Sequence, residues 1–306
     1  MFRFIVRRLL VTIPMVLVVL TLTWSLIRLA PGNFYSGERA LPAGIERNIR
    51  EKYGLDRPWY VQYGKMIGNT ARGDFGTSLR YEGQTVNEIL GRTIPVSAAI
   101  GIMAYALALV VGVTAGTIAA VRQNSRFDYG SMTFAMLGIS MPNFVLGPLL
   151  VLLFSLTLYW FPPARWDGVP SRSMVLPVLT LSAIYMAYIA RLARAGMLEV
   201  LRSDYIRTAR AKGLDERHIV IRHAMRGGLL PVLSFSGPAL AILVTGTVVV
   251  ERIFALPGVG NYFINANLNR DEPLVLGIVA FISVVILCFN LLVDVAYGFI
   301  DPRVRY

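Results

Sequence analysis

Lysine is informative about nucleotide binding, because a P-loop requires it at a fixed position. A P-loop cradles phosphates with the pattern Gly-x-x-x-x-Gly-Lys-Ser/Thr. The chain has three lysines, Lys52, Lys65 and Lys212, and none is followed by serine or threonine. The sequence therefore contains no P-loop, so the chain has no nucleotide site of this kind.

Histidine and cysteine offer equally little chemistry. The two histidines, His218 and His223, are five residues apart, and we expect them not to share a helix face well. A His-Glu-x-x-His zinc helix and a Gly-x-Ser-x-Gly nucleophile elbow are both absent. The single cysteine, Cys288, excludes an intramolecular disulfide. The sequence predicts no catalytic, cofactor-binding or metal-binding residue.

The elements of this chain are long apolar runs. The composition is 55% hydrophobic and 16% charged, and a membrane-spanning helix needs roughly 20 mainly apolar residues. The sequence predicts an all-α membrane protein with six transmembrane helices. Few ionisable residues lie inside these runs, which disfavours an ion-coupled pump. The predicted spans are about 9–30, 96–121, 132–161, 174–196, 227–250 and 274–299.

The distribution of charge predicts the orientation. The net charge is +12, which in a soluble protein would suggest nucleic-acid binding. With the N-terminus inside, however, the cytoplasmic segments hold 16 of the 30 Lys and Arg residues. This agrees with the positive-inside rule, and the flipped topology would place the basic stretch 191–226 outside. We expect both termini in the cytoplasm of a multi-pass protein of the inner membrane, and no nucleic-acid partner.

The N-terminal run follows three arginines and could be a signal peptide. Its apolar part is longer than the usual 7–15 residues, and Pro31 stands where a cleavage site would end. An uncleaved first span is the preferred interpretation. The segment 31–94 then forms a small external insert between the first two spans, with short helices expected at Glu46–Tyr53 and Val86–Leu90 and turns or extended chain elsewhere.

The internal segment 191–226 has the most specific local pattern. Ser203 or Asp204 can cap a two-turn helix, and Gly213 suits the left-handed residue that ends it. Asp215 offers a cap for a second, basic helix that returns to the membrane. Such a loop could merely fix topology by its charge, or it could be a docking knob for a cytoplasmic partner.

These features resemble the permease subunits of binding-protein-dependent ABC importers, in particular the oligopeptide and dipeptide permeases. The stretch 204–231, DYIRTARAKGLDERHIVIRHAMRGGLLP, resembles their cytoplasmic coupling loop. Within the family, 37–39 and 83–86 favour the first membrane subunit of the oligopeptide branch. Further similar segments are FIVRRLLVTIP at 4–14, RLAPGNFYSGERALP at 28–42, GDFGTS at 73–78, ERIFALPGVG at 251–260 and DPRVRY at 301–306.

The resemblance implies a partner set and a site. A homologous second permease, two cytoplasmic ATPase subunits that bind ATP and Mg²⁺, and a periplasmic or lipid-anchored peptide-binding protein would assemble with this chain in membrane lipid. Peptide would pass between the two permeases, and external loops would receive the binding protein. The ATPase-coupling residues would be Asp204, Tyr205, Arg207, Thr208, Ala209, Arg210, Ala211, Lys212 and Gly213.

The segment that resembles the coupling loop departs from the family pattern, and alternatives for the cargo and for the class of transporter remain. Ala209 and Gly213 match the family loop pattern Glu-Ala-Ala-x-x-x-Gly, whereas Arg207 and Thr208 do not. An acidic contact at that position is therefore not implied. The cargo could instead be dipeptides, nickel chelates, glutathione or murein peptides. A passive channel working without ATPases is the alternative from another class.

Overall fold

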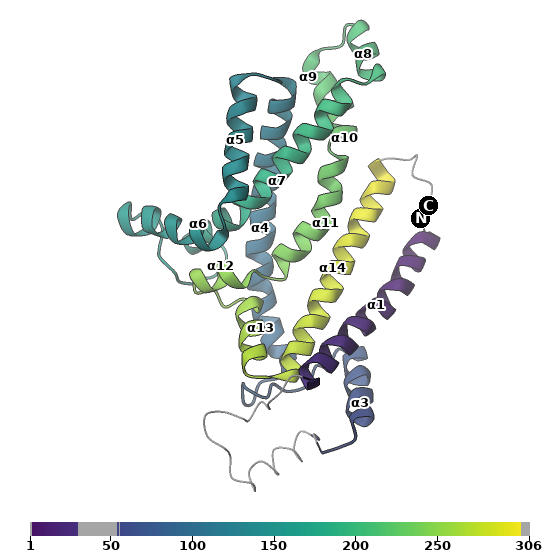
Figure 1. Cartoon of the computed structure of the whole chain (residues 1–306), viewed down its shortest axis with the longest axis vertical. Helices are drawn as coiled ribbons and strands as arrows, with labels where there is room; N and C mark the ends of the chain where they lie inside the picture. The colour runs from purple at the N-terminus through teal and green to yellow at the C-terminus, as the bar shows by residue number, and fades with distance from the viewer. Residues whose placement is uncertain (1, 30–53, 55, 301–306) are drawn as a thin grey trace.

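The computed structural model describes residues 2–29, 54 and 56–300, with side chains described for 10–29, 54 and 56–296. These residues form a bundle of helices and contain no β-strand (Figure 1). The expected helix Glu46–Tyr53 lies outside the described residues. In chain order the elements are α1 (Phe2–Leu29), α3 (Trp59–Ala71), α4 (Val86–Val121), α5 (Arg126–Ser140), α6 (Asn143–Leu150), π-helix η1 (Val151–Thr157), 3₁₀-helix η2 (Arg172–Met174), α7 (Val175–Leu201), α8 (Asp204–Ala211), α9 (Glu216–His218), π-helix η3 (Ile219–Ala224), α10 (Met225–Gly228), α11 (Leu230–Val244), α12 (Val248–Ile253), α13 (Val259–Leu268) and α14 (Glu272–Ile300).

Five helical segments of the described chain are long and apolar enough to cross a membrane: 10–29, 86–121, 172–201, 230–253 and 272–296. A sixth exists only if α5 and the α6–η1 segment count together, and these two meet at 104°. The span predicted over 132–161 is therefore divided in this structure by a sharp bend between α5 and α6. Pro142 lacks an N–H and disfavours helical backbone at the residue before it, and Met141 is accordingly extended.

Two other predicted boundaries differ for local reasons. The expected helix at 86–90 and the span that follows it form one helix, α4. It begins with a capping box, because Thr85 Oγ1 accepts from the Glu88 N–H (3.2 Å) and the Glu88 carboxylate accepts from the Thr85 N–H (3.0 Å). The span expected over 227–250 is divided between α11 and α12 by Gly246, whose φ is +93°.

The helix α3 was not predicted, because turns or extended chain were expected over 59–71. Its stability comes from packing against α1 at the external insert. The Thr21 and Tyr63 hydroxyls are 2.7 Å apart, and the Trp24 and Tyr63 rings meet edge to face with centroids 5.3 Å apart. Tertiary contact of this kind stabilises short helices more than intrinsic propensity does.

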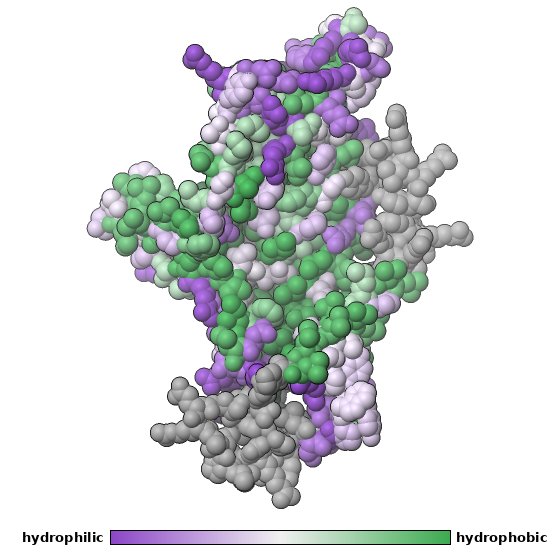
Figure 2. Space-filling view, viewed as in Figure 1, coloured by the Kyte–Doolittle hydropathy of each residue, from purple (hydrophilic) through white to green (hydrophobic). Residues whose placement is uncertain are grey.

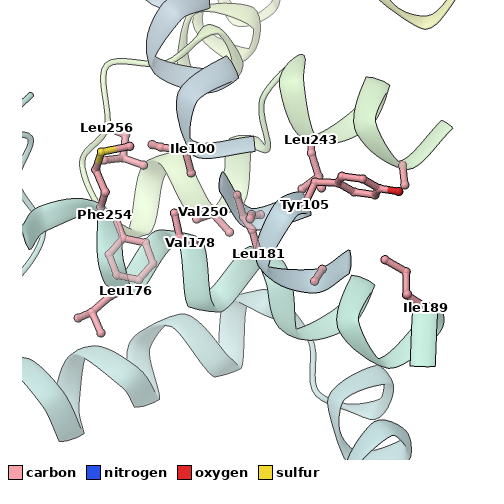
Figure 3. Packing of buried hydrophobic residues seen from close by; sticks show 14 of the residues in the cluster. Ile100, Tyr105, Leu176, Val178, Leu181, Ile189, Leu243, Val250, Phe254 and Leu256 are labelled. Carbon is pink, nitrogen blue, oxygen red and sulfur yellow. The ribbon is translucent and has the colours of Figure 1, made fainter. Parts of the chain in front are cut away.

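The core lies where α4, α7 and α11 cross. Figure 3 shows Ile100 and Tyr105 of α4 close to side chains of α7, α11 and α12. Small residues permit the close approach of α4 and α7. A Cβ at Gly112 would lie 2.8 Å from the Met186 carbonyl oxygen, and one at Gly116 would lie 2.3 Å from the Ala190 carbonyl oxygen. Glycine is therefore required for this packing, as in other membrane bundles.

The two ends of the bundle are polar and its middle is apolar. Figure 1 places α8 and α9 at one end and α3 and α13 at the other. The chain enters α1 and leaves α14 on the side nearer α8. Hydrophilic residues collect over α8 and α9, and hydrophobic ones cover much of the middle (Figure 2). This distribution is that of a bilayer-embedded protein.

Candidate functional site: the loop that carries α8

The short helix α8 ends at Gly213 in the way that the sequence predicts. Gly213 has φ +75°, a conformation that only glycine adopts without steric cost. Its N–H donates to the Arg210 carbonyl (2.9 Å), and the Leu214 N–H donates to the Ala209 carbonyl (3.4 Å). These two bonds form a Schellman motif. The chain therefore turns sharply after α8 and satisfies its last carbonyls.

The start of α8 differs from the prediction that Ser203 or Asp204 caps it. Ser203 occupies the N-cap position, but its hydroxyl donates to the Val200 carbonyl (2.6 Å). Asp204 is the first helical residue, and its carboxylate pairs with the Arg207 guanidinium. Thr208 Oγ1 donates back to the Asp204 carbonyl (2.9 Å). Ser203 instead helps close the turn that joins α7 to α8.

One face of α8 is anchored in a small apolar cluster. Ile206 is 0% exposed and Ala209 is 8% exposed. They pack with Met197 near the end of α7 and with Ile219 and Ala224 of the returning segment. Burying an isoleucine side chain contributes about 1.5–3 kcal/mol. The helix is therefore fixed to the bundle rather than hanging from a flexible loop.

The other face of α8 is open and mainly basic. Among the predicted coupling residues, only Ala209 is buried. The other eight predicted coupling residues are exposed at the end of the bundle, and three of them are basic. The exposed members are Asp204, Tyr205, Arg207, Thr208, Arg210, Ala211, Lys212 and Gly213.

An exposed ion pair spans the turn at Gly213 between α8 and α9. The Arg210 guanidinium contacts the Glu216 carboxylate with Nη2–Oε1 and Nε–Oε2 distances of 2.6 and 3.1 Å. Hydrogen bonding to Arg210 lowers the pKa of Glu216, and the same pair raises the pKa of Arg210. The pair spans Gly213 and joins α8 to α9, so it limits the angle between them.

The returning segment begins as predicted, with the Asp215 carboxylate accepting from the Arg217 N–H (3.1 Å). The two histidines contradict the sequence prediction. His218 and His223 lie with ring centroids 5.6 Å apart, because η3 is a π-helix and its wider turn brings residues five apart together. No group of three or more potential metal ligands occurs among the described residues.

A buried ion pair connects the base of this loop to the neighbouring turn. Asp128 is 1% exposed, and its carboxylate receives two bonds from Arg194 of α7, at 2.6 and 2.8 Å. It also accepts from the Asn124 N–H (2.9 Å). Nearby, Arg202 donates to the Gln123 side chain (3.2 Å). The end of α7 and the α4–α5 turn therefore form one rigid unit. Asp128 is the single acid in that turn, beside Arg122 and Arg126, and this isolation is the signal in the sequence that marks it.

A second buried acid organises the 251–260 motif. Glu251 is 3% exposed, and it accepts from the Ser97 hydroxyl (2.7 Å) and the Asn261 N–H (3.1 Å). A Cβ at Gly258 or Gly260 would lie 2.3 or 2.9 Å from this carboxylate. The glycines of the motif thus leave room for the acid, which ties α12 and α13 to α4.

A third buried acid explains part of the 73–78 motif. Asp271 is 0% exposed, and its carboxylate accepts from the Ser78 hydroxyl and from the N–H groups of Leu79 (3.1 Å) and Leu274 (3.3 Å). It fastens the loop before α4 to the start of α14. None of these three acids was predicted as a functional residue.

The chain matches one transport family along most of its length. Residues 1–97 match the N-terminal part of the membrane component of binding-protein-dependent transport systems, and residues 112–306 match the inner membrane component of such systems. Its similarity to the oligopeptide transport system permease protein OppB is 47% identity for Salmonella typhimurium and 46% for Haemophilus influenzae, with 100% of both chains covered. It is 41% identical to the dipeptide transport system permease protein DppB of Bacillus subtilis, over 100% of this chain and 98% of that one.

Solved structures share the fold at low sequence identity. The inward-facing MetNI methionine ABC transporter matches with a TM-score of 0.56 and 15% identity, over 70% of this chain and 96% of that one. An amino acid ABC transporter matches with a TM-score of 0.51 and 16% identity, over 69% and 93%.

The chain therefore belongs to the family of inner membrane components of binding-protein-dependent transport systems. It is an integral inner-membrane permease subunit of a multi-subunit ABC importer. Its curated relatives are permease subunits, which are not catalytic themselves.

Proposed function

We propose that this chain is the permease subunit of an importer that moves oligopeptides across the inner membrane. The observation that carries this proposal is full-length similarity, at 46–47% identity, to oligopeptide transport system permeases. The three buried acids described above are held in hydrogen bonds to serine, arginine and backbone N–H groups. The chain would act as the moving subunit of a transporter that is powered by ATP and Mg²⁺ bound to two separate ATPase subunits.

The proposed point of contact with an ATPase is the exposed face of α8. Tyr205, Arg207 and Lys212 project from it, while Ile206 and Ala209 anchor it. An ATPase subunit that closes around α8 would move α7 as well, since the apolar cluster joins α8 to α7. Asp128 and Arg194 would extend that movement to the α4–α5 turn. A ligand shifts a two-state equilibrium only by its different affinity for the states, and ATP would act here through its own subunits.

The same proposal places α8 and both termini in the cytoplasm. The excess of arginine in 191–226 supports this orientation. The opposite end, with α3 and α13, would then face the periplasm and a periplasmic or lipid-anchored peptide-binding protein. A homologous second permease would complete the transmembrane part and the peptide path.

Uptake of labelled peptides tests the proposal. Cells lacking this gene, in a background without a redundant system, should lose uptake of tri- to pentapeptides and regain it on complementation. The purified complex should also contain two ATPase subunits. Unchanged uptake in the deletion strain would refute the proposed function.

Dipeptides are the second candidate cargo, favoured by the 41% identity to a dipeptide permease. Mass spectrometry of the ligand retained by the cognate binding protein would separate the two cargos. Recovery of dipeptides alone would favour the second candidate, and recovery of longer peptides would favour the first.

A further inference from the structure

The short helix α12 carries two adjacent charges that point in different directions. Glu251 and Arg252 are the only charged residues of the candidate span 230–253. The Glu251 carboxylate points inward and is 3% exposed, whereas Arg252 is exposed. Ionisable residues within membrane spans are costly and usually mark a functional site. Glu251 has an evident structural role, and Arg252 does not.

The inner side of α12 is held rigidly. Val250, Phe254 and Leu256 are buried in the main core, where Figure 3 shows them among side chains of α4 and α7. The Glu251 carboxylate adds its bonds to Ser97 and to the start of α13. The outer face of α12 is therefore presented in a fixed orientation, as a binding site requires.

The position of α12 means that its outer face does not meet lipid tails. In Figure 1 it lies across the bundle between α6 and α13, deeper than the ends where α4 and α14 begin. Non-helical backbone flanks it at 245–247 and 254–258. Such backbone at membrane depth is tolerated only where it is buried in protein or lines a water-filled cavity. Figure 2 shows hydrophilic surface in the notch below the α6 arm. Because ionisable residues of membrane spans almost always face the bundle interior or water, the exposed Arg252 side chain indicates that this face of α12 meets water rather than lipid tails.

The guanidinium of Arg252 has unused hydrogen-bonding capacity. It donates to Asn265 Oδ1 of α13 (3.3 Å), and no carboxylate among the described residues forms an ion pair with it. Arginine presents five N–H donors in a fork that matches a carboxylate. One helical turn earlier, Val249 is 47% exposed. The face thus offers a cation beside a small apolar patch.

We propose that Arg252 binds the carboxyl terminus of the transported peptide. The proposal rests on the peptide-import function stated above. Peptides of different sequence share few groups, and the terminal carboxylate is the one that a free guanidinium recognises best. The amino terminus carries the same charge as Arg252 and would be repelled. Asn265 acts as a positioning residue that aims the guanidinium, and Val249 contacts the last side chain.

The test compares two tripeptides, trialanine and its C-terminal amide, in the reconstituted complex. Uptake into liposomes is measured with binding protein at concentrations that saturate it with each peptide. The wild type should import the free acid at least about tenfold faster than the amide, because hydrogen bonds between charged groups are typically worth that factor. Arg252→Met should lower the import rate of the free acid to that of the amide and leave the import rate of the amide unchanged. Arg252→Lys should recover part of the difference, since lysine keeps the charge without the fork.

Arg126→Met is the matched control. Arg126 is also an exposed arginine, the first residue of α5 at the end of the bundle away from α13, and its loss should leave both rates unchanged. Equal import of both peptides by the wild type would overturn the proposal, as would an equal loss of both in Arg252→Met. Failure of that variant to co-purify with the second permease would also overturn it, making Arg252 a subunit contact. If the wild type imports neither peptide, the proposed function fails and this inference falls with it.

Discussion

The ion pair between Asp128 and Arg194 allows a quantitative test of how the base of the α8 loop is held. Asp128→Asn keeps the size of the side chain and its acceptor for the Asn124 N–H, but it removes the charge that Arg194 faces. Breaking a buried ion pair by removing one partner costs about 3–5 kcal/mol. Asp128 is buried at 1% exposure, whereas the Arg194 side chain is 28% exposed and can recover some hydration. We therefore expect a loss of about 2–4 kcal/mol.

The assay is a double-mutant cycle on the chain in detergent micelles. Asp128→Asn, Arg194→Met and the double variant are unfolded with increasing denaturant and followed by tryptophan fluorescence. The double variant should lose less than the sum of the single ones, because removing both partners leaves no uncompensated buried charge. The coupling should exceed about 1 kcal/mol.

The chain supplies its own control in the pair between Asp204 and Arg207. Their side chains are 92% and 71% exposed, and exposed pairs three residues apart on a helix contribute about 0.2–0.5 kcal/mol. The same cycle on this pair should give a coupling in that low range. If the two cycles give equal couplings, burial is not what strengthens the pair, and the reasoning is refuted.

Three further results are expected. Gly213→Val should abolish peptide uptake while ATP hydrolysis by the complex continues, because a β-branched residue cannot adopt φ +75° without strain. Normal uptake by this variant would contradict the proposal that the turn at Gly213 couples ATP hydrolysis to transport. Gly116→Ala should destabilise the bundle by about 1–3 kcal/mol, since its Cβ would meet the backbone of α7, whereas Gly130→Ala, with open space around it, should be close to neutral; equal thermal stabilities of the two variants would count against this packing. Arg210 lowers the pKa of Glu216. The ion pair between them therefore stabilises the loop at pH values above the pKa of Glu216 in the unfolded chain, which is about 4.3. This stabilisation is lost as the pH falls through the lower pKa that Glu216 has in the folded protein. Glu216→Gln should therefore be less stable than the wild type at pH 7 and should match it at acidic pH, and a difference that persists in acid would exclude this pair as the cause.

Some of the differences between prediction and structure follow from local backbone chemistry. Pro142 interrupts the helix in the third apolar run. The extended backbone of Met141 could be predicted from the Met141–Pro142 dipeptide alone. Others depend on neighbours that a local pattern does not contain. The helix α3 is stabilised by α1, and the contact between His218 and His223 arises from a π-helical turn whose formation depends on packing of the whole loop.

The sequence alone determined the class of protein and the shape of its most exposed loop. A bilayer offers the backbone no hydrogen-bond partners, so long uncharged runs can form only helices there. Gly213 could be assigned to a left-handed turn because that conformation restricts residue type at a single position.

Only the tertiary structure decided what the scattered acids do. Asp128, Glu251 and Asp271 meet partners 66, 154 and about 193 residues away in the chain. A carboxylate must find such partners to be buried at all, but its local sequence does not say where they are. Tertiary folding also turned Glu251 inward and the adjacent Arg252 outward, because successive residues of a helix point about 100° apart and only one of them could face the core.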